Sequence, residues 1–358
     1  MIKMNAKLYL PFPFKVPKGI KDLSSNILWL QNIGLIKRYE HAELVARTSS
    51  EYLRCCYPNI ANCAFHDFVD FASWNCLMDD IMEESNGVFK SSEDKVELLC
   101  TFKFICEHDL ERTEEVEEKF ALINAFIDVK SRIKKHISDE NYYYIMYSLS
   151  HFFSGIIWEI SSNYTKKRIT LDYYCMIKTK SVGVLMAYSL SLALHNIKPD
   201  AKLMNEKTFV IMMNCILFVM AIDNDIYSFN KEKNGKEKIF NIIDIIQHTM
   251  HVDLHQATAL SISIRNKYLH KYILLKGELS SHPNIKNYAA CFESLIAGNI
   301  YFGSSCQRYT NKIETHNGSN SGTFTSSLYS FEISPDYYED NIQSIIDLTP
   351  STSWWLNY

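Results

Sequence analysis

The sequence predicts an all-α protein with a single large helical domain. Glycine and proline are both scarce, with 11 and 8 residues in a chain of 358, so few positions interrupt a helix. Between the prolines lie long stretches in which apolar residues recur at helical spacing, whereas the alternation that is typical of strands is almost absent. With 47% hydrophobic residues, the chain has enough apolar side chains to fill one large core.

The chain is expected to begin with an extended strap over residues 1–20. The segment LYLPFPFKVP contains Pro11, Pro13 and Pro17, and each proline holds the residue before it outside the helical region. The helical domain is then expected to span residues 21–309.

Helices are expected along the whole of this domain. The stretches with helical periodicity are 22–47, 65–85, 92–108, 113–136, 139–163, 170–195, 200–229, 237–250, 254–276 and 285–309. Within this series, Asp253 and Gln256 form a capping-box pattern that predicts the start of a new helix.

The composition changes after Tyr309. The segment NKIETHNGSNSGTFTSSLYSFEISPDYYED is rich in Ser, Thr, Asn and Gly, which is typical of loop or disorder. We expect residues 310–358 to form a tail whose apolar end, WWLNY, can pack back on the body.

Charge, cysteine content and hydropathy exclude several classes of protein. The net charge is only -4 and the Lys and Arg residues are scattered, so no nucleic-acid partner is expected. The run 209–222 comes nearest to a membrane span and is cut short by Asp223 and Asn224. Ten cysteines occur without a CxxC pair, and the N-terminus lacks an apolar signal segment. We therefore expect a cytoplasmic protein with reduced thiols.

Oxygen-bearing side chains follow the most apolar helix. In the segment IDNDIYSFNKE, the side chains of Asn224, Ser228 and Glu232 are spaced i, i+4 and i+8, so they form one line on a continuous helix. An amide, a hydroxyl and a carboxylate are ligands that suit Mg²⁺. Lys231 lies beside the last of them and can meet an anion there. The alternative is a polar helix end with fortuitous spacing.

A second acidic cluster ends an earlier apolar helix. Asp79, Asp80 and Glu83 follow the segment FVDFASWNCLM, and Asp79 and Glu83 lie one turn apart on the same face. Packed carboxylates repel one another, and a divalent cation relieves that repulsion. On its own the cluster is equally well explained as a solvated helix face. Two such helix ends facing each other would clamp a diphosphate through bound cations.

The two segments together resemble the motifs of the class I terpene synthases, particularly the single-domain microbial ones. DDIME is similar to the aspartate-rich motif DDxx(x)D/E, and NDIYSFNKE is similar to the triad NDxxSxxxD/E. Arg308 and Tyr309 match the C-terminal Arg-Tyr pair of the family. PFPF near the start and WEI at 158–160 extend the resemblance, which runs from about residue 8 to residue 309.

The resemblance implies a fold, a reaction and a set of site residues. The fold would be the helical barrel of the class I terpenoid synthases, with three Mg²⁺ ions held between the two motifs. The reaction would be ionisation of a prenyl diphosphate, most simply farnesyl diphosphate with geranylgeranyl diphosphate left open, and cyclisation or rearrangement of the carbocation. Independently of the resemblance, we expect a monomer or homodimer. The catalytic residues implied are Asp79, Asn224, Ser228, Glu232, Arg308 and Tyr309.

Two positions depart from the family pattern. Lys178, with Lys180 close by, stands where the family usually has a diphosphate-sensing arginine, and lysine lacks the bidentate fork of arginine. Phe302 stands where the family commonly has a tryptophan before the Arg-Tyr pair. With Lys231 and Arg308, these lysines are the expected diphosphate contacts.

Aromatic side chains are candidates for the lining of a carbocation pocket, because their faces attract cations. Phe68 and Phe71 share a helical face with Asp79, whereas Trp74 points away from it. For each candidate, ordinary core packing is the more common role. The candidates are Phe68, Phe71, Phe153, Trp158 and Phe302.

Two rival classes of protein share part of this pattern. A chain-elongating prenyltransferase has the same helical architecture but would carry two aspartate-rich motifs. A non-catalytic helical protein that binds an apolar ligand would show no metal dependence. His248, His251 and His255 have the spacing of a zinc site on one helix, but the capping-box pattern at Asp253 would divide them between two helices.

Overall fold

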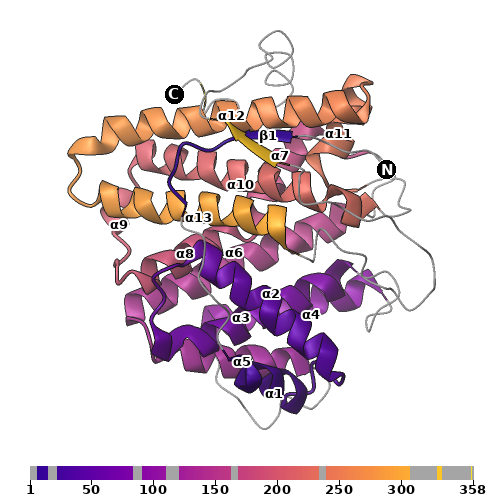
Figure 1. The fold of residues 1–358 in the computed structure, drawn as a ribbon, viewed down its shortest axis with the longest axis vertical. Coiled ribbons are helices and arrows are strands. Elements are labelled where there is room, and N and C mark those ends of the chain that lie inside the picture. Colours follow the sequence, from indigo (N-terminus) through magenta and orange to yellow (C-terminus); the bar gives the residue numbers. More distant parts are fainter. Residues whose placement is uncertain are drawn as a thin grey trace.

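The protein is all-α, as the sequence predicts (Figure 1). The computed structural model describes residues 6–14, 22–83, 91–109, 121–162, 168–233, 239–306, 329–332 and 356. Its longer helices are α1 (Ser24–Asn32), α2 (Tyr39–Cys56), α3 (Asn62–Glu83), α4 (Ser92–His108), α5 (Ala121–Lys134), α6 (Asp139–Ser162), α7 (Leu171–Ser181), α8 (Val184–Leu194), α10 (Lys207–Lys233), α11 (Ile242–Met250), α12 (Leu254–Glu278) and α13 (Ile285–Ser305). Two short elements, α9 (Ala201–Met204) and η1 (Leu279–Ser281), lie between them.

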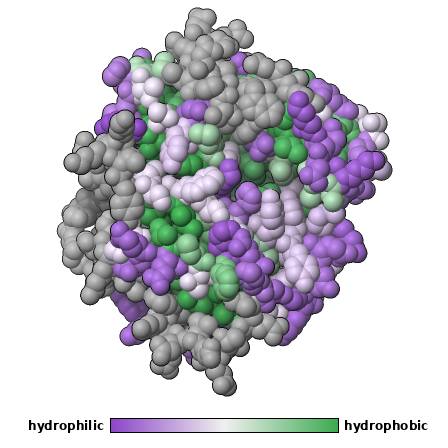
Figure 2. All heavy atoms as spheres, turned by 180° about the vertical axis from the view of Figure 1, so that it is seen from behind, coloured by the Kyte–Doolittle hydropathy of each residue, from purple (hydrophilic) through white to green (hydrophobic). Residues whose placement is uncertain are grey.

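Helix α10 is the central helix of the bundle. It packs against α12, α13, α7, α8 and α11, so apolar side chains are buried around its circumference. It contains the run 209–222 that comes nearest to a membrane span in the sequence, and the whole helix has the length and composition of one. However, 78% of its most apolar 18-residue stretch is buried inside the protein. On the face opposite to that of Figure 1, hydrophobic side chains reach the surface in separate patches among hydrophilic ones (Figure 2).

Three predicted helices are wrong because the chain turns inside them. The helix predicted over 22–47 is two helices, α1 and α2, and Gly34 between them has φ +80°. The helix predicted over 170–195 breaks at Gly183, with φ +73°, into α7 and α8. The helix predicted over 200–229 is divided into α9 and α10. The capping box of Asp253 and Gln256 does start α12.

Both ends of the chain contribute to a small sheet. Strand β1 (Ala6–Tyr9) lies in the predicted strap and pairs in parallel with β2 (Tyr329–Glu332), with Ala6 opposite Tyr329. The prediction of loop or disorder for the tail is therefore wrong for β2. Leu356, in the apolar end of the tail, packs against the hydrophobic core. The rest of the tail lies outside the described residues.

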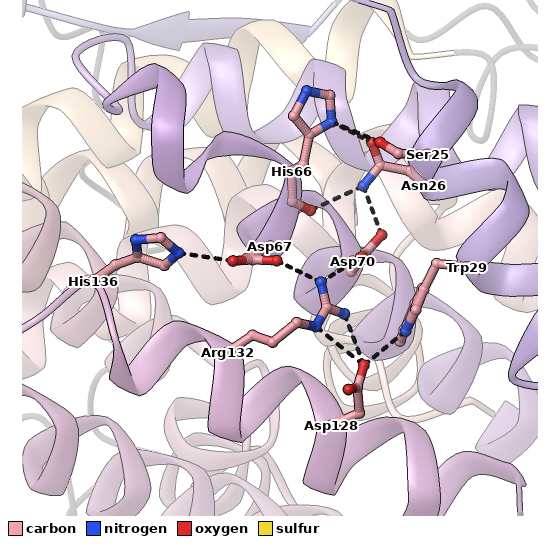
Figure 3. A network of polar contacts seen from close by, with 9 residues as sticks. All are labelled: Ser25, Asn26, Trp29, His66, Asp67, Asp70, Asp128, Arg132 and His136. Carbon is pink, nitrogen blue, oxygen red and sulfur yellow. Dashed lines mark hydrogen bonds and ion pairs between the residues drawn. The ribbon is translucent and has the colours of Figure 1, made fainter.

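A polar network fixes the first half of α3 to α1 and α5 (Figure 3). The guanidinium of Arg132 on α5 contacts Asp67 at 2.5 Å and Asp70 at 2.8 Å, both on α3. Asn26 on α1 donates to Asp70 Oδ1 at 2.6 Å. The network also contains Ser25, Trp29, His66, Asp128 and His136. These contacts hold α3 in place, and the far end of the same helix carries the aspartate-rich motif.

Candidate active site

One large cavity lies among the helices that carry the predicted motifs. Its volume is about 700 Å³, and its walls come from α2, α3, α4, α6, α7, α8, α10 and α13. Such a volume is within the usual range for sites that bind small molecules.

Helix α10 presents one face to this cavity. The lining residues on α10 include Asn224, Ser228 and Glu232, together with Tyr227 and Lys231. Their spacing of three and four residues places them on one side of the helix. The line of oxygen-bearing side chains predicted from the sequence therefore faces an interior space.

The C-terminal end of α3 lies opposite this face. Asp79 lines the same cavity, and Lys231 Nζ on α10 lies 3.2 Å from Asp80 Oδ1. The two acidic helix ends, about 150 residues apart in sequence, are thus adjacent in the fold. The side chain of Glu83 lies outside what the structure describes, as do Arg308 and Tyr309.

The triad residues are connected by hydrogen bonds. Ser228 Oγ donates to Glu232 Oε1 at 2.6 Å, and Asn241 Nδ2 donates to Glu232 Oε2 at 3.1 Å. Burial raises the pKa of the Glu232 carboxyl, and the charge of Lys178 opposes that shift. Both carboxylate oxygens are therefore oriented before any ligand binds.

Lys178 lines the cavity beside the triad. Its Nζ lies 2.9 Å from Asp225 Oδ1, and its side chain is 7% exposed. Burial alone would lower the pKa of Lys178, but the carboxylates of Asp225, Glu159 and Glu232 raise it above its ordinary value. Lys178 therefore brings a fixed positive charge to the site.

Asp225 is held by several groups besides this lysine. Tyr174 Oη donates to Asp225 Oδ2 at 2.7 Å, and the backbone N–H of Ile242 donates to the same oxygen at 2.6 Å. Asp225 thus connects α10 to α7 and α11, and it positions Lys178 against the cavity.

Lys180 and three of the predicted aromatic residues do not line this cavity. Phe68 is fully buried in the core. Phe153 packs in an aromatic cluster, with its ring centroid 6.4 Å from that of Trp74. Trp158 is 46% exposed, and Lys180 Nζ lies 5.2 Å from its ring. We therefore leave Phe68, Phe153, Trp158 and Lys180 out of the candidate site.

Phe68 was predicted from helical spacing, Lys180 from its place near Lys178, and Phe153 and Trp158 only as further aromatic candidates. Helical spacing gives the face of one helix, but it does not give the neighbour that the face meets. Phe71 and Phe302 do line the cavity, and Phe302 makes an edge contact with Tyr52 at 5.3 Å between ring centroids.

Further lining residues were missed by the sequence analysis. Tyr52, Tyr57, Tyr227 and Asn299 belong to α2, α10 and α13 or directly follow them, and they carry no motif of their own. Glu159 also lines the cavity, and burial raises its pKa to about 7 against the opposing charge of Lys178. The WEI segment contains this glutamate, so the family resemblance at 158–160 was the feature of the sequence that could have identified Glu159 as a lining residue.

The donor atoms fit a hard divalent cation. Carboxylate, amide and hydroxyl oxygens are the ligands that Mg²⁺ accepts, and Asp79, Asn224, Ser228 and Glu232 supply them around one cavity. In the described part of the chain, no three His, Cys, Asp or Glu side chains are grouped so as to hold a metal by themselves. Mg²⁺ usually keeps several waters and binds substrate phosphates, so two facing partial ligand sets fit it better than a closed cage.

The histidines at 248, 251 and 255 do not form such a site either. Helix α11 ends at Met250, and His251 has a left-handed backbone conformation with φ 54°. His255 belongs to the first turn of α12, after the capping box at Asp253. The division of this set between two helices agrees with the sequence analysis.

Comparison with known families identifies the class of protein. The family model described as "Terpene synthase family 2, C-terminal metal binding" matches residues 70–271, which is more than half of the chain. The chain belongs to the terpene synthase family. The resemblance inferred from the motifs is confirmed, and the protein is a class I terpene synthase. The description of the family also supports a metal cofactor.

Curated relatives are synthases of the same kind. Germacrene A synthase from Nostoc punctiforme is 24% identical over 312 residues, which cover 85% of this chain and 94% of the relative. 4-epi-cubebol synthase from Streptosporangium roseum is 19% identical over 309 residues, which cover 85% of this chain and 92% of the relative.

Solved structures show the same fold. The SVS_A2 protein from ancestral sequence reconstruction superposes with a TM-score of 0.74 over 98% of both chains, at 16% identity. Linalool/nerolidol synthase from Streptomyces clavuligerus superposes with a TM-score of 0.70, covering 82% of this chain and 99% of its own, at 13% identity. The helical architecture of this terpene synthase is therefore that of known terpene synthases.

Proposed function

We propose that this terpene synthase uses Mg²⁺ to ionise farnesyl diphosphate and then cyclises or rearranges the carbocation, releasing diphosphate. One observation carries the proposal: Asp79 and the triad Asn224, Ser228 and Glu232 line the same cavity, from opposite sides. Replacing any of these oxygen donors would remove part of a ligand set that the fold has assembled from two distant segments.

Each group in the site has a proposed role. Asp79 with Asp80 and Glu83 would hold magnesium on the α3 side, and Asn224, Ser228 and Glu232 on the α10 side, with three ions expected from the family resemblance. Lys178 and Lys231 would contact the diphosphate. Arg308 and Tyr309 are proposed contacts from the resemblance alone.

Magnesium bound between these residues would neutralise the diphosphate leaving group, so that the allylic C–O bond can break without a protein nucleophile. The chain's own residues hold the substrate and shield the cation from water. Phe71, Phe302, Tyr52 and Tyr57 line the cavity, and aromatic faces attract a positive charge.

The length of the substrate is proposed from the relatives and the cavity. The name of the Streptosporangium roseum relative states that it cyclises (2E,6E)-farnesyl diphosphate. A Streptomyces relative that is 24% identical over 186 residues is a diterpene cyclase, so geranylgeranyl diphosphate is the second candidate. A cavity of about 700 Å³ admits either chain.

The test is incubation of the purified protein with geranyl, farnesyl and geranylgeranyl diphosphates, with and without Mg²⁺. Diphosphate release and extracted products are measured together. A terpene hydrocarbon or alcohol from farnesyl diphosphate, formed only with Mg²⁺, is expected. Transfer of a second isoprenoid unit would instead favour a chain-elongating prenyltransferase, and binding of an apolar ligand without turnover would favour a non-catalytic protein.

We also propose a cytoplasmic location and a monomer or homodimer. The ten cysteines of the sequence all lie in the described part of the chain and are free thiols, which supports a reducing compartment.

A further inference from the structure

A hydrogen-bonded pair stands in the wall between α10 and α13. Tyr227 Oη on α10 donates to Asn299 Oδ1 on α13 at 2.8 Å. Both residues line the cavity, and they are 9% and 8% exposed. The phenol proton of Tyr227 is therefore committed to a fixed acceptor in the protein.

The ring of Tyr227 rests against the backbone of α13. A Cβ atom added to Gly303 would lie 2.5 Å from Tyr227 Cε1 and closer still to Cδ1, so any side chain at that position would displace the ring. Asn299 and Gly303 are one turn apart and share a helix face. Helix α13 thus holds this tyrosine at two points, the hydroxyl and the ring edge.

Helix α13 is itself fixed on its other side. A Cβ atom at Gly298 would clash with the backbone carbonyl of Cys55 on α2, so α13 and α2 also meet without an intervening side chain. The position of Asn299 is therefore set by close backbone contact with a second helix. The hydrogen bond from Tyr227 to Asn299 in turn fixes the position of Tyr227.

The place of Tyr227 in the sequence puts its ring next to the proposed ligands. It lies three residues after Asn224 and immediately before Ser228, and all three residues line the cavity. It is the aromatic residue that α10 contributes to the described lining. Its ring thus lies on the same face of α10 as the proposed metal ligands.

We propose that Tyr227 determines product specificity, and that Asn299 is its positioning residue. This inference rests on the proposed function. The ring offers its face to the carbocation, and the hydrogen bond to Asn299 fixes the angle of that ring. Because a tenfold change in the ratio of two products corresponds to about 1.4 kcal/mol between competing steps, a small rotation of this ring is enough to redirect the cation.

The test compares the products of Tyr227→Phe, Asn299→Leu and the double variant with those of the wild type. Each single variant breaks the same hydrogen bond, so we expect both to shift the ratio of the two main products in the same direction, by about threefold or more. The double variant should shift it no further than the larger single effect, because the two changes act through one bond.

Two further variants complete the design. Gly303→Ala should also change the product ratio, because its methyl group displaces the ring into the cavity. Tyr272→Phe is the matched control: this tyrosine is buried, its hydroxyl donates to Glu293 Oε1 at 3.3 Å, and it does not line the cavity. It should give the wild-type ratio. Tyr227→Phe removes one hydroxyl and keeps the ring, so it tests the proposal even where a larger change prevents folding.

Wild-type product ratios in Tyr227→Phe and Asn299→Leu would overturn the inference and leave the proposed function intact. The proposed function fails by a different result, which is that the wild-type protein releases no diphosphate from any prenyl diphosphate in the presence of Mg²⁺. The ratio of products is the deciding readout, because a role in stability alone would lower the amount of active enzyme without changing what it makes.

Discussion

The two ends of α3 carry aspartates in different surroundings. Near its start, Asp67 and Asp70 are both bound by Arg132 at 2.8 Å or less, in a network that joins three helices (Figure 3). At its end, Asp79 lines the cavity and Asp80 contacts Lys231 from the opposite wall. The first pair is held by ion pairs that connect helices within the fold, whereas Asp79 of the second pair borders a cavity that a ligand can occupy. The residue type is therefore less informative than what the folded protein places opposite it.

The same contrast occurs within three consecutive residues of α10. Asp223 is fully buried, and its Oδ1 accepts from Arg265 Nε at 2.8 Å. Asp225 is fully buried against Lys178 and Tyr174. Asn224 lies between them and lines the cavity. Successive residues on a helix are about 100° apart, so one tripeptide serves both the core and the site.

The largest effect should come from removing a proposed metal ligand. We expect Asp79→Ala and Asn224→Ala each to lower turnover by about 10³-fold or more, because charge neutralisation of the leaving group is the main catalytic demand. Circular dichroism should show unchanged helical content. Turnover at the wild-type rate in either variant would contradict the proposal that the replaced residue binds metal.

The opposite result is expected at the start of α3. Arg132→Leu leaves the Asp70 carboxylate, 3% exposed, without its ionic partner. Loss of one partner of a buried pair costs about 3 to 5 kcal/mol, so the free energy of unfolding in urea should fall by that order. At a temperature where the variant is folded, its turnover should remain close to that of the wild type. A loss of turnover with no loss of stability would contradict this structural role.

Lys178 can both stabilise the fold and serve the site, because it pairs with Asp225 and also lines the cavity. If it contacts the diphosphate, Lys178→Ala should lower turnover by about 10-fold to 100-fold, and Lys178→Arg should restore most of it. Stability is measured in parallel by thermal unfolding. Lowered stability with unchanged kinetics in Lys178→Ala would mean that the lysine stabilises the fold and does not contact the diphosphate.

The smallest effect concerns pH. Burial raises the pKa of Asp70 from its ordinary 3.8 to about 6, although Asn26 and Arg132 oppose the shift. The folded protein thus holds this proton more tightly than the unfolded chain, so the resulting stabilisation is complete below about pH 4 and is lost as pH rises through about 6. The stability difference between the wild type and Asp70→Asn should therefore fall by the order of 2 kcal/mol between about pH 4.5 and about pH 7.5. A stability difference that rises with pH would contradict a raised pKa of Asp70 in the folded protein.

The sequence was sufficient for the fold class and for the faces that carry the motifs. The spacing of Asn224, Ser228 and Glu232 fixes one side of a helix whatever surrounds it, and the structure places that side on the cavity. Local signals did not reveal the break at Gly183, because apolar residues continue through it into α8.

Features set by tertiary packing were not predictable in this way. The pairing of β2 with β1 joins segments at opposite ends of the chain, and a short strand in a polar tail has little local pattern. Tyr52 and Tyr57 line the cavity because of how α2 packs against α13, which periodicity within α2 does not contain. Trp158 was mistaken for a lining residue for the same reason.

The most direct test is a crystal structure of the protein grown with Mn²⁺ and inorganic diphosphate, with the ions located by their anomalous scattering. We expect Mn²⁺ within about 2.2 Å of oxygens of Asp79 on one side and of Asn224, Ser228 and Glu232 on the other, with diphosphate between them. Mn²⁺ bound only at Asp67 and Asp70, with none in the cavity, would contradict the account.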